Sequence, residues 1–539
     1  MPYFGSPVRV PRSLTSVLIV EPTLGLDASQ PSVDAPLGST PDSDNFIMRE
    51  GGLELRPTLA VRGTNQQPIA SRVLGGAEVI DVGGTRYPLI SGTTLLAWYS
   101  NGSWSQLSYV SAGGVDAPPA AGNTDYWDWT QIYFDLRDEN IAVGGNASYQ
   151  TGYCWQANTL TFSTLTGAPR ALRWAAFDNY LLAANVRSSE NSDWVQRVQW
   201  SDRGSASSWT GGLSGYEDLL ASKGAITRLL AQENRIIVGL DNEIWQGFPV
   251  DFPFVFRFAP LDTSVGMPYP WTVANTPRGI VFLNRDYQTY LLPKEGGPAV
   301  PIGQRLHRIL RNTIDQPQRA WAAYDNTYSQ YQLYYAIKGG SGLPQRAVYL
   351  NLNEGSWAPQ SFDRVTGGLS LTRGFEAQRS SSATTWGGLA AQSVRWADLN
   401  MSWAELAGAS EERAVHLGSS GGTMYHLSSN ATSDAGIAVP AYWQSGALEG
   451  LSPGVQKTVS EIRVDYEGTS ASSLTVKVSP NQGATFASGT HVALPTTSGV
   501  SQAIAYPHTA ARYPMLRVEV EDQRPRLFRF HVVMRQGGR

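Results

Sequence analysis

The chain has 539 residues, enough for about two to four domains, and carries a small formal net charge of -4 with only 16% charged residues. The 41 Lys and Arg residues include no run of five or six, which argues against a sequence-reading DNA-binding protein, because such a surface must neutralise many phosphates. The single Cys154 excludes an intrachain disulfide framework and a zinc knuckle built on paired cysteines. We expect it to be a buried free thiol.

The sequence predicts no membrane-spanning segment, since no stretch approaches the ~20 apolar residues that a spanning helix needs. It opens with Met1-Pro2-Tyr3 and has no cationic segment leading into an apolar run, so we expect synthesis in a cytoplasm without export by the usual signal.

The composition favours an all-β protein. The chain contains 54 Gly, 32 Pro, 17 Trp and 24 Tyr, which suit turns and short strands better than long surface helices. Residues 1–65 are rich in Pro, Ser and Asp, and they predict an extended N-terminal arm with platform strands. Turn-forming residues there are joined to short strands at 24–27, 44–46 and 51–57.

Residues 66–436 repeat one pattern, in which an alternating apolar run, a polar turn and a second alternating run follow one another. The pairs of runs are 77–82 and 85–90, 132–136 and 141–144, 172–177 and 180–184, 226–230 and 235–238 (then 243–246), 279–283 and 288–292, and 321–324 and 332–337. These hairpins recur at intervals of roughly 40 to 55 residues, which is typical of four-stranded propeller blades. The spacing predicts a β-propeller-like body, with a long up-and-down β-array as the alternative.

Three short helices and a second domain complete the prediction. Helical patterns occur at 217–223, at 305–314, where Leu306, Ile309 and Leu310 share one side, and at 393–406. Residues 437–539 alternate apolar and polar side chains over long runs such as 462–466 and 516–520, so that one face is buried and the other is wet. This pattern predicts a C-terminal β-sandwich.

The candidates for chemistry are weak. None of the six histidines, His307, His416, His426, His491, His508 and His531, has the i, i+4 spacing of a zinc protease, so we expect no metal site. Residues 418–422 match the G-x-S-x-G nucleophile motif, but a strand pattern follows, which indicates a glycine-rich hairpin. Propellers also host glycosidases that use two acids, and Asp125, Asp128, Asp135, Asp138 and Glu139 cluster in the sequence. Clustering in the sequence says little about distance in space, however, and Asp138-Glu139-Asn140 has ordinary turn composition.

Two further motifs have structural and functional interpretations. Residues 479–486 resemble the Asp-box hairpin of sialidase-type propellers, although Asn481 replaces the acid and Phe486 the usual Trp. We expect it to be a folding device. The aromatic cluster Tyr126-Trp127-Asp128-Trp129 could stack on sugar rings if it is exposed, or could fill space between blades or subunits.

A series of ordered short motifs lies in the middle of the chain. It comprises residues 177–185, 198–204 with Trp209, 224–229, 235–239, Ile244-Trp245, 254–258, 266–268, 280–283 and 301–303. Together with Gly25-Leu26-Asp27, Asn45 and Leu55-Arg56, this order resembles the tail nozzle proteins of short-tailed bacteriophages (the tail tubular protein B-like family). The resemblance covers about two-thirds of the chain.

The resemblance implies a structural virion protein of the viral tail, assembled in the host cytoplasm. Nozzle proteins form a homohexameric tube through which the genome is ejected. The implied partners are identical subunits, a tail adaptor ring above, and a tail needle, plug or fibres. Duplex DNA would pass through without sequence-specific binding, along a channel wall that we expect to be acidic or neutral.

From these observations we predict that the chain is not an enzyme and has no catalytic, cofactor-binding or metal-binding residues. The alternative is a carbohydrate-binding or glycan-hydrolysing propeller that acts in recognition of a host receptor.

Overall fold

The computed structural model describes residues 15–65, 67–111, 118–135, 138–146, 152–187, 193–251, 254–362, 370–378, 413–429, 433–449, 454–468, 471–521 and 524–536. The described fold is all-β apart from the helix α1 (Gln304–Thr313) and short 3-10 turns. It divides into two compact units. The sandwich unit comprises Met1–Thr58, Val348–Ser361 and Thr432–Arg539, and the propeller unit comprises Leu59–Ala347 and Phe362–Ala431.

The sandwich unit contains two antiparallel sheets. One consists of β1 (Thr15–Val20), β5 (Phe46–Arg49), β6 (Gly52–Leu55), β39 (Lys457–Glu467), β42 (Ser501–Ala505), β43 (Thr509–Ala511) and β45 (Arg526–Gln536). The other consists of β4 (Asp42–Asp44), β38 (Pro440–Gln444), β40 (Ser472–Ser479), β41 (Thr490–Leu494) and β44 (Met515–Glu521). The predicted alternation is confirmed, since Ile462, Val464 and Tyr466 are buried and Arg463 is exposed. Residues 15–55, predicted as an arm, supply strands to both sheets.

A buried arginine connects distant segments of the sandwich unit. The Arg56 side chain is fully buried, and each of its five N–H groups has an acceptor. Nε donates to Asn45 Oδ1 (3.0 Å), Nη1 to the Pro57 carbonyl and Asp434 Oδ1 (3.0 Å each), and Nη2 to the Ser361 carbonyl (3.1 Å) and Asp434 Oδ2. Burial of this guanidinium is tolerated because a carboxylate and three further oxygens accept the hydrogen bonds that it would otherwise donate to water.

Asn45 extends the same network. Its amide donates to Ser361 Oγ (3.0 Å) and to the Pro440 carbonyl (2.9 Å), and its Oδ1 accepts from the Ser361 backbone N–H (3.0 Å). The Asn45 backbone is left-handed (φ 62°), a conformation that asparagine tolerates better than most residues. The network therefore joins residues 45, 56, 361, 434 and 440, which are far apart in the sequence.

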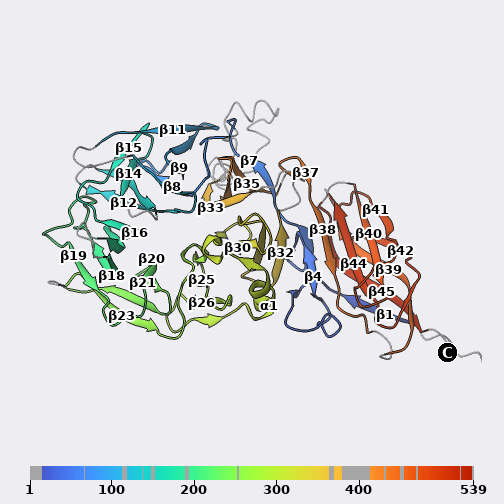
Figure 1. The fold of residues 1–539 in the computed structure, drawn as a ribbon. Helices are drawn as coiled ribbons and strands as arrows, with labels where there is room; N and C mark the ends of the chain where they lie inside the picture. The colour runs from blue at the N-terminus through green and yellow to red at the C-terminus, as the bar shows by residue number, and fades with distance from the viewer. Residues whose placement is uncertain are drawn as a thin grey trace, which may run out of the picture. The chain divides into compact units, whose positions relative to one another are not determined.

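The propeller unit is built from successive antiparallel sheets, which follow one another around a ring in Figure 1. Its first two sheets consist of β8 (Gly75–Ile80), β9 (Arg86–Ser91), β10 (Leu96–Ser100) and β11 (Ser103–Tyr109), and of β12 (Trp127–Phe134), β13 (Glu139–Asn146), β14 (Tyr153–Gln156) and β15 (Thr161–Thr164). The next three consist of β16 (Arg170–Phe177), β17 (Tyr180–Arg187), β18 (Asp193–Trp200) and β19 (Gly215–Asp218); β20 (Ile226–Gln232), β21 (Arg235–Leu240), β22 (Ile244–Pro249) and β23 (Phe256–Asp262); and β24 (Ala274–Thr276), β25 (Gly279–Leu283), β26 (Thr289–Pro293) and β27 (Val300–Pro301). The last two contain β28 (Ile314–Asp315), β29 (Trp321–Asp325) and β30 (Gln330–Ile337), and β33 (Leu371–Gln378), β34 (Arg413–Ser419) and β35 (Met424–Ser428) with β7 (Thr58–Val61). The strands β31 (Arg346–Asn351) and β32 (Trp357–Ser361) lie mostly or wholly within the residues of the sandwich unit.

The ring closes through the pairing of β7 with β35, which places an N-terminal strand in the last sheet. Within the described residues the innermost strands are β8, β12, β16, β20, β24, β29 and β33, and β33 contacts β8. Apolar clusters fill the spaces between neighbouring sheets. One packs Trp174 of β16 on Ile141 of β13, and another packs Phe375 of β33 on Ile90 of β9. The fold is thus a β-propeller-like body and not an open array. The sheets β8–β11 and β12–β15 are further joined by a parallel pair, β11 with β15.

The predicted hairpins are confirmed, and their turns explain the motif residues. Asp178 and Asn179 both have positive φ (46° and 61°), as the two-residue turn between β16 and β17 requires. Gly204 has φ 66°, and a Cβ there would lie 1.8 Å from Asp135 Oδ2, so only glycine fits. Asp202 Oδ1 accepts from the backbone N–H groups of Arg203 and Leu213 (3.0 Å each).

The helix predictions have mixed outcomes. The helix at 305–314 is confirmed as α1, with Leu306 and Leu310 buried. The helix at 217–223 is wrong, because Gly215–Asp218 pairs with β18 as the edge strand β19 and the following residues form turns. The pattern at 393–406 lies outside the described residues. No helix in the described part of the chain has the length and apolar character to cross a bilayer.

The Arg56 network generates a test of stability. Arg56→Met leaves the carboxylate of Asp434 buried without its partner, and we expect it to lower the free energy of unfolding by about 3–5 kcal/mol. The matched control is Arg187→Met, which removes an ion pair whose side chains are 47% and 41% exposed. This control should cost at most about 1 kcal/mol. Urea denaturation measures both, and equal losses in the two variants would contradict the role given to Arg56.

Candidate functional site

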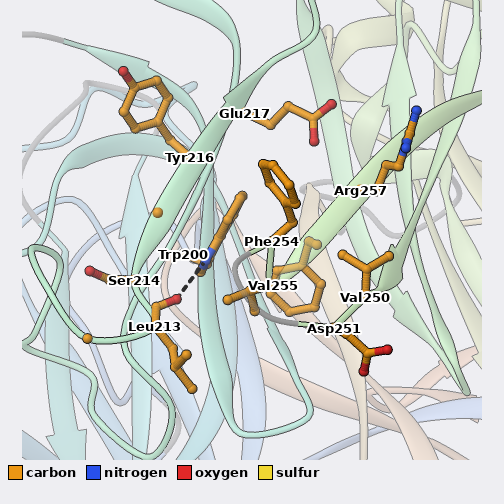
Figure 2. A pocket seen from close by; sticks show the side chains of 13 residues that line it. Trp200, Leu213, Ser214, Tyr216, Glu217, Val250, Asp251, Phe254, Val255 and Arg257 are labelled. Atoms are coloured by element: carbon orange, nitrogen blue, oxygen red, sulfur yellow. Dashed lines mark hydrogen bonds between the residues drawn. The ribbon is translucent and has the colours of Figure 1, made fainter.

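The candidate site is a groove of about 630 Å³ at the outer edge of two neighbouring propeller sheets. One side is the edge strand β19 with the preceding turn. The other is the segment that joins β22 to β23, including Val250, Asp251 and residues 254–257. Figure 2 shows these side chains around Phe254, with Glu217 above it and Asp251 below it in this view. The groove is therefore apolar and aromatic, with acidic and basic groups at its margins.

Aromatic packing fixes the floor of the groove. Trp200, at the end of β18, donates its indole N–H to the Leu213 carbonyl (3.0 Å), and its ring meets Phe256 edge-on at 5.3 Å. Phe256 is buried and also contacts Tyr180 (5.2 Å). By contrast, Phe254 is 71% exposed. The exposed Phe254 ring thus lies in the same groove as the packed side chains of Trp200 and Phe256, and it can stack on a ligand or a partner.

An arginine holds the edge strand in place. The guanidinium carbon of Arg197 lies 3.7 Å from the centre of the Trp194 ring and 3.9 Å from that of Tyr216. Arg197 also makes two hydrogen bonds to Asp218, of 2.6 and 2.7 Å. Because all five N–H groups of arginine lie in one plane, it can stack and bind a carboxylate at the same time. These contacts tie β19 to β18 and present Tyr216, which is 58% exposed, beside the groove.

Glu217 lines the groove, and its surroundings shift the pKa of its carboxyl. Burial raises the pKa of the Glu217 carboxyl, while the backbone N–H of Phe258 and the charge of Arg257 act in the opposite direction. A carboxyl with a raised pKa keeps its proton at higher pH and can donate it to a ligand. The groove can therefore bind a ring-bearing ligand, with Glu217 as a hydrogen-bond or proton donor.

The acidic cluster found in the sequence does not form one site. Asp128 lies near the start of β12 and pairs with Arg228 (2.7 Å), whereas Asp135 follows the end of that strand and accepts from Asn179 (3.1 Å). Asp135 lies seven positions after Asp128 along the strand direction, a separation of roughly 23 Å. Asp125 accepts from the Gly122 backbone N–H, and Asp138 accepts from the Tyr133 hydroxyl. These two aspartates make local contacts, whereas Asp128 belongs to an ion pair between strands.

Of the two interpretations of the aromatic cluster, the structure supports the one in which it fills space within the fold. Tyr126 is 4% exposed and Trp127 is 1% exposed, and Trp127 stacks on Trp129 with ring centres 5.2 Å apart. These rings pack inside the propeller unit and cannot present a sugar-binding face. The reason is the position of β12 as an innermost strand, which periodicity alone does not reveal.

The remaining motifs are local structure. Residues 418–422 form the turn between β34 and β35, in which Ser419 Oγ accepts from the Thr423 N–H (2.9 Å). In the Asp-box-like segment, Asn481 Oδ1 accepts from the Thr485 N–H (2.8 Å), as expected of a folding device. His416 and His426 are cross-strand neighbours, with ring centres 6.1 Å apart, and burial beside Arg62 lowers the pKa of His416. Among the described residues, no group of three or more His, Cys, Asp or Glu side chains could hold a metal ion.

Two carboxyls that the sequence analysis missed, one buried and one partly buried, lie on innermost strands of the propeller unit. Asp325, at the end of β29, is 1% exposed, and burial raises its pKa to about 7. Its Oδ1 accepts from the backbone N–H groups of Thr327 (3.0 Å) and Tyr328 (3.3 Å). Burial also raises the pKa of Glu376 on β33, which pairs with Arg413 (3.2 Å). An aspartate before a turn residue such as Asn326 reads as ordinary turn chemistry, so no sequence signal separated Asp325 from the rest.

Comparison with known proteins gives matches in structure only. No family model and no curated protein sequence matches the chain. The matched solved structures include an exo-β-1,3-galactanase from Phanerochaete chrysosporium with galactose (10% identity, TM-score 0.30, 89% of this chain and 100% of the other). They also include the Pan2 WD40 domain of Neurospora crassa (7%, 0.33, 69% and 95%) and a glycoside hydrolase family 43 arabinoxylan arabinofuranohydrolase from Bacillus subtilis (9%, 0.24, 88% and 99%). At these values the likeness concerns the fold alone.

This comparison corrects one prediction. The sequence analysis predicted that the chain is not an enzyme; the matched folds include glycoside hydrolases, so the fold gives no ground for that prediction and we do not keep it. The absence of a recognisable catalytic motif was its only basis. Catalytic carboxylates that come from separate blades leave no local motif, so the inference from motifs was unsound.

Asp325 generates a test of pH dependence. Between about pH 4 and pH 7 this carboxyl is protonated in the folded chain and ionised in the unfolded chain, so unfolding releases a proton. The free energy of unfolding should therefore fall as the pH rises through this window, by about 1.4 kcal/mol per unit, and level off above pH 7. Asp325→Asn should flatten this slope, whereas Asp178→Asn, at a side chain that is 53% exposed, should keep it. Thermal unfolding at several pH values measures the effect, and an unchanged slope in Asp325→Asn would refute the assignment.

Proposed function

We propose that the chain is a tail nozzle protein, whose identical copies assemble into a ring that conducts phage DNA. The proposal rests on the positions of the motif residues in the structure. Asn45 and Arg56 belong to the buried network of the sandwich unit, and Asp202 and Gly204 hold a propeller turn. The residues that resemble the nozzle family are thus those on which the shape of each unit depends, as expected of a protein whose role is assembly.

Surface properties support the same proposal. Tyr216 and Phe254, which line the same groove, are 58% and 71% exposed, and exposed aromatic side chains gathered at one groove suit a surface that a neighbouring subunit covers. The free edge of β19 is a further element that another chain could cover. The formal net charge of -4 suits a conduit that does not hold DNA.

Ring assembly and DNA binding test the proposal together. We expect negative-stain imaging and native mass measurement to show six-fold particles. Fluorescence anisotropy should give dissociation constants for duplex DNA of about 1 μM or weaker, as for non-specific contacts. A chain that stays monomeric at all concentrations, or that binds duplex DNA tightly with a steep salt dependence, would exclude a nozzle.

The aromatic groove favours a second function, recognition or hydrolysis of a glycan. The exposed Phe254 ring can stack on a sugar face, and the Glu217 carboxyl, whose pKa burial raises, lies beside it as the candidate acid, with Asp251 on the other side of Phe254. In this proposal the groove, and not the buried cluster around Trp127, is the sugar site.

Variants in the groove test this second function with a panel of labelled oligosaccharides. We expect Phe254→Ala to weaken glycan retention about tenfold, equivalent to about 1.4 kcal/mol, and Glu217→Gln to abolish any hydrolysis while retaining binding. Phe248→Ala is the control, because Phe248 is 39% exposed on β22 and lies outside the groove lining. Equal effects of Phe254→Ala and Phe248→Ala, or no retention by the wild type, would exclude a glycan site in the groove.

A further inference from the structure

Three arginines converge on one tryptophan among the innermost strands of the propeller unit. The guanidinium carbons of Arg373, Arg173 and Arg228 lie 3.6, 4.6 and 5.7 Å from the centre of the Trp271 ring. They come from β33, β16 and β20, and Trp271 belongs to the 3-10 turn η2 (Pro270–Thr272) before β24. Arg173 and Arg373 are two hundred positions apart in the sequence, so it is the circular arrangement of the propeller sheets that brings their strands together.

The cluster carries more positive than negative charge. Asp128 bonds Arg228 (2.7 Å), and its other oxygen accepts from the Trp174 backbone N–H (3.2 Å). Asp128 is the acidic group that acts on Arg373, whereas Arg228 and Arg173 both repel it. Burial, with this repulsion, lowers the pKa of Arg373 to about 9, so the guanidinium is still charged at neutral pH. Among the described residues, Arg373 and Arg228 thus share Asp128 as their acidic neighbour.

Several polar atoms of the cluster lack a partner. Arg373 Nη1, Arg228 Nε and the Tyr126 hydroxyl are buried without a hydrogen bond. The Tyr126 ring lies 6.0 Å from that of Trp271 and 5.7 Å from the guanidinium carbon of Arg373, so the three atoms belong to one site. Unpaired buried donors are costly, and a charged one more so. Stacking on Trp271 offsets this in part but supplies no acceptor.

From this geometry we propose that the cluster is a binding site for a phosphate group, held by Arg373 and Arg228 with the Tyr126 hydroxyl as a further donor. A phosphate carries a charge of about -1.5 to -2 at pH 7 and several acceptor oxygens, which match the surplus charge and the unpaired donors. One arginine guanidinium can donate two N–H groups to two oxygens of the same phosphate. The Arg228 side chain is 15% exposed, so solvent reaches the edge of the cluster. This inference does not depend on the nozzle or the glycan proposal.

Isothermal titration of the full chain tests the site. We expect inorganic phosphate to bind the wild type, and Arg373→Met, which keeps the length of the side chain, to weaken this binding at least tenfold. Arg278→Met is the control, because Arg278 is exposed and outside the cluster, and it should bind phosphate as the wild type does. Wild-type affinity in Arg373→Met, or no binding of phosphate to the wild type, would overturn the proposal.

A second measurement covers the case in which Arg373→Met does not fold. The wild-type melting temperature should rise in inorganic phosphate but not in chloride of equal ionic strength, because only an anion bound to the folded state stabilises it specifically. Glycerol phosphate distinguishes the sources of the group: a shift with both compounds indicates a phosphate ester ligand, and a shift with inorganic phosphate alone indicates the free ion. An equal shift in chloride or in acetate would contradict a phosphate site.

Discussion

The buried guanidinium of Arg56 is the interaction on which the sandwich unit depends. It is fully enclosed, and its five donors reach residues 45, 57, 361 and 434, so the strands that hold these residues must all be in place before the charge is satisfied. A partly assembled network would leave a charge in an apolar interior, which costs several kcal/mol. The network therefore favours a single arrangement of segments that are distant in the sequence, and it makes the assembly of that unit cooperative.

Closure of the ring is the corresponding constraint in the propeller unit. An array of four-stranded sheets would leave two ends exposed, whereas pairing of β7 with β35 puts the first strand of the body into its last sheet. Closure also directs all innermost strands to one axis. The buried carboxyl of Asp325, the arginine cluster around Trp271 and the packed ring of Trp127 follow from that convergence. Outward-facing edges, such as β19, keep the exposed aromatic side chains.

The two proposed functions use different parts of the molecule. A nozzle depends on the shape of each unit and on surfaces that identical copies cover, and the resemblance to that family rests on residues that hold turns and the Arg56 network. A glycan site depends on the chemistry of one groove, where Phe254 and Glu217 lie together. The lack of a local catalytic motif does not decide between them, because catalytic carboxylates from separate blades leave no such motif. The phosphate site concerns a third region and is compatible with either function.

Local patterns in the sequence are enough to predict the all-β class, the hairpins and their turns, because alternation of apolar side chains and residues such as Asp178-Asn179 and Gly204 act locally. They also predict the alternation of the sandwich strands and a helix at 305–314, which the structure shows as α1 (Gln304–Thr313). The tertiary structure was needed to establish that β19 is a strand, since Glu217–Lys223 has a local helical pattern that pairing with β18 overrides. It likewise decided that Trp127 is buried and that Arg173, Arg228 and Arg373 meet, because contacts between innermost strands join residues with no fixed spacing along the chain.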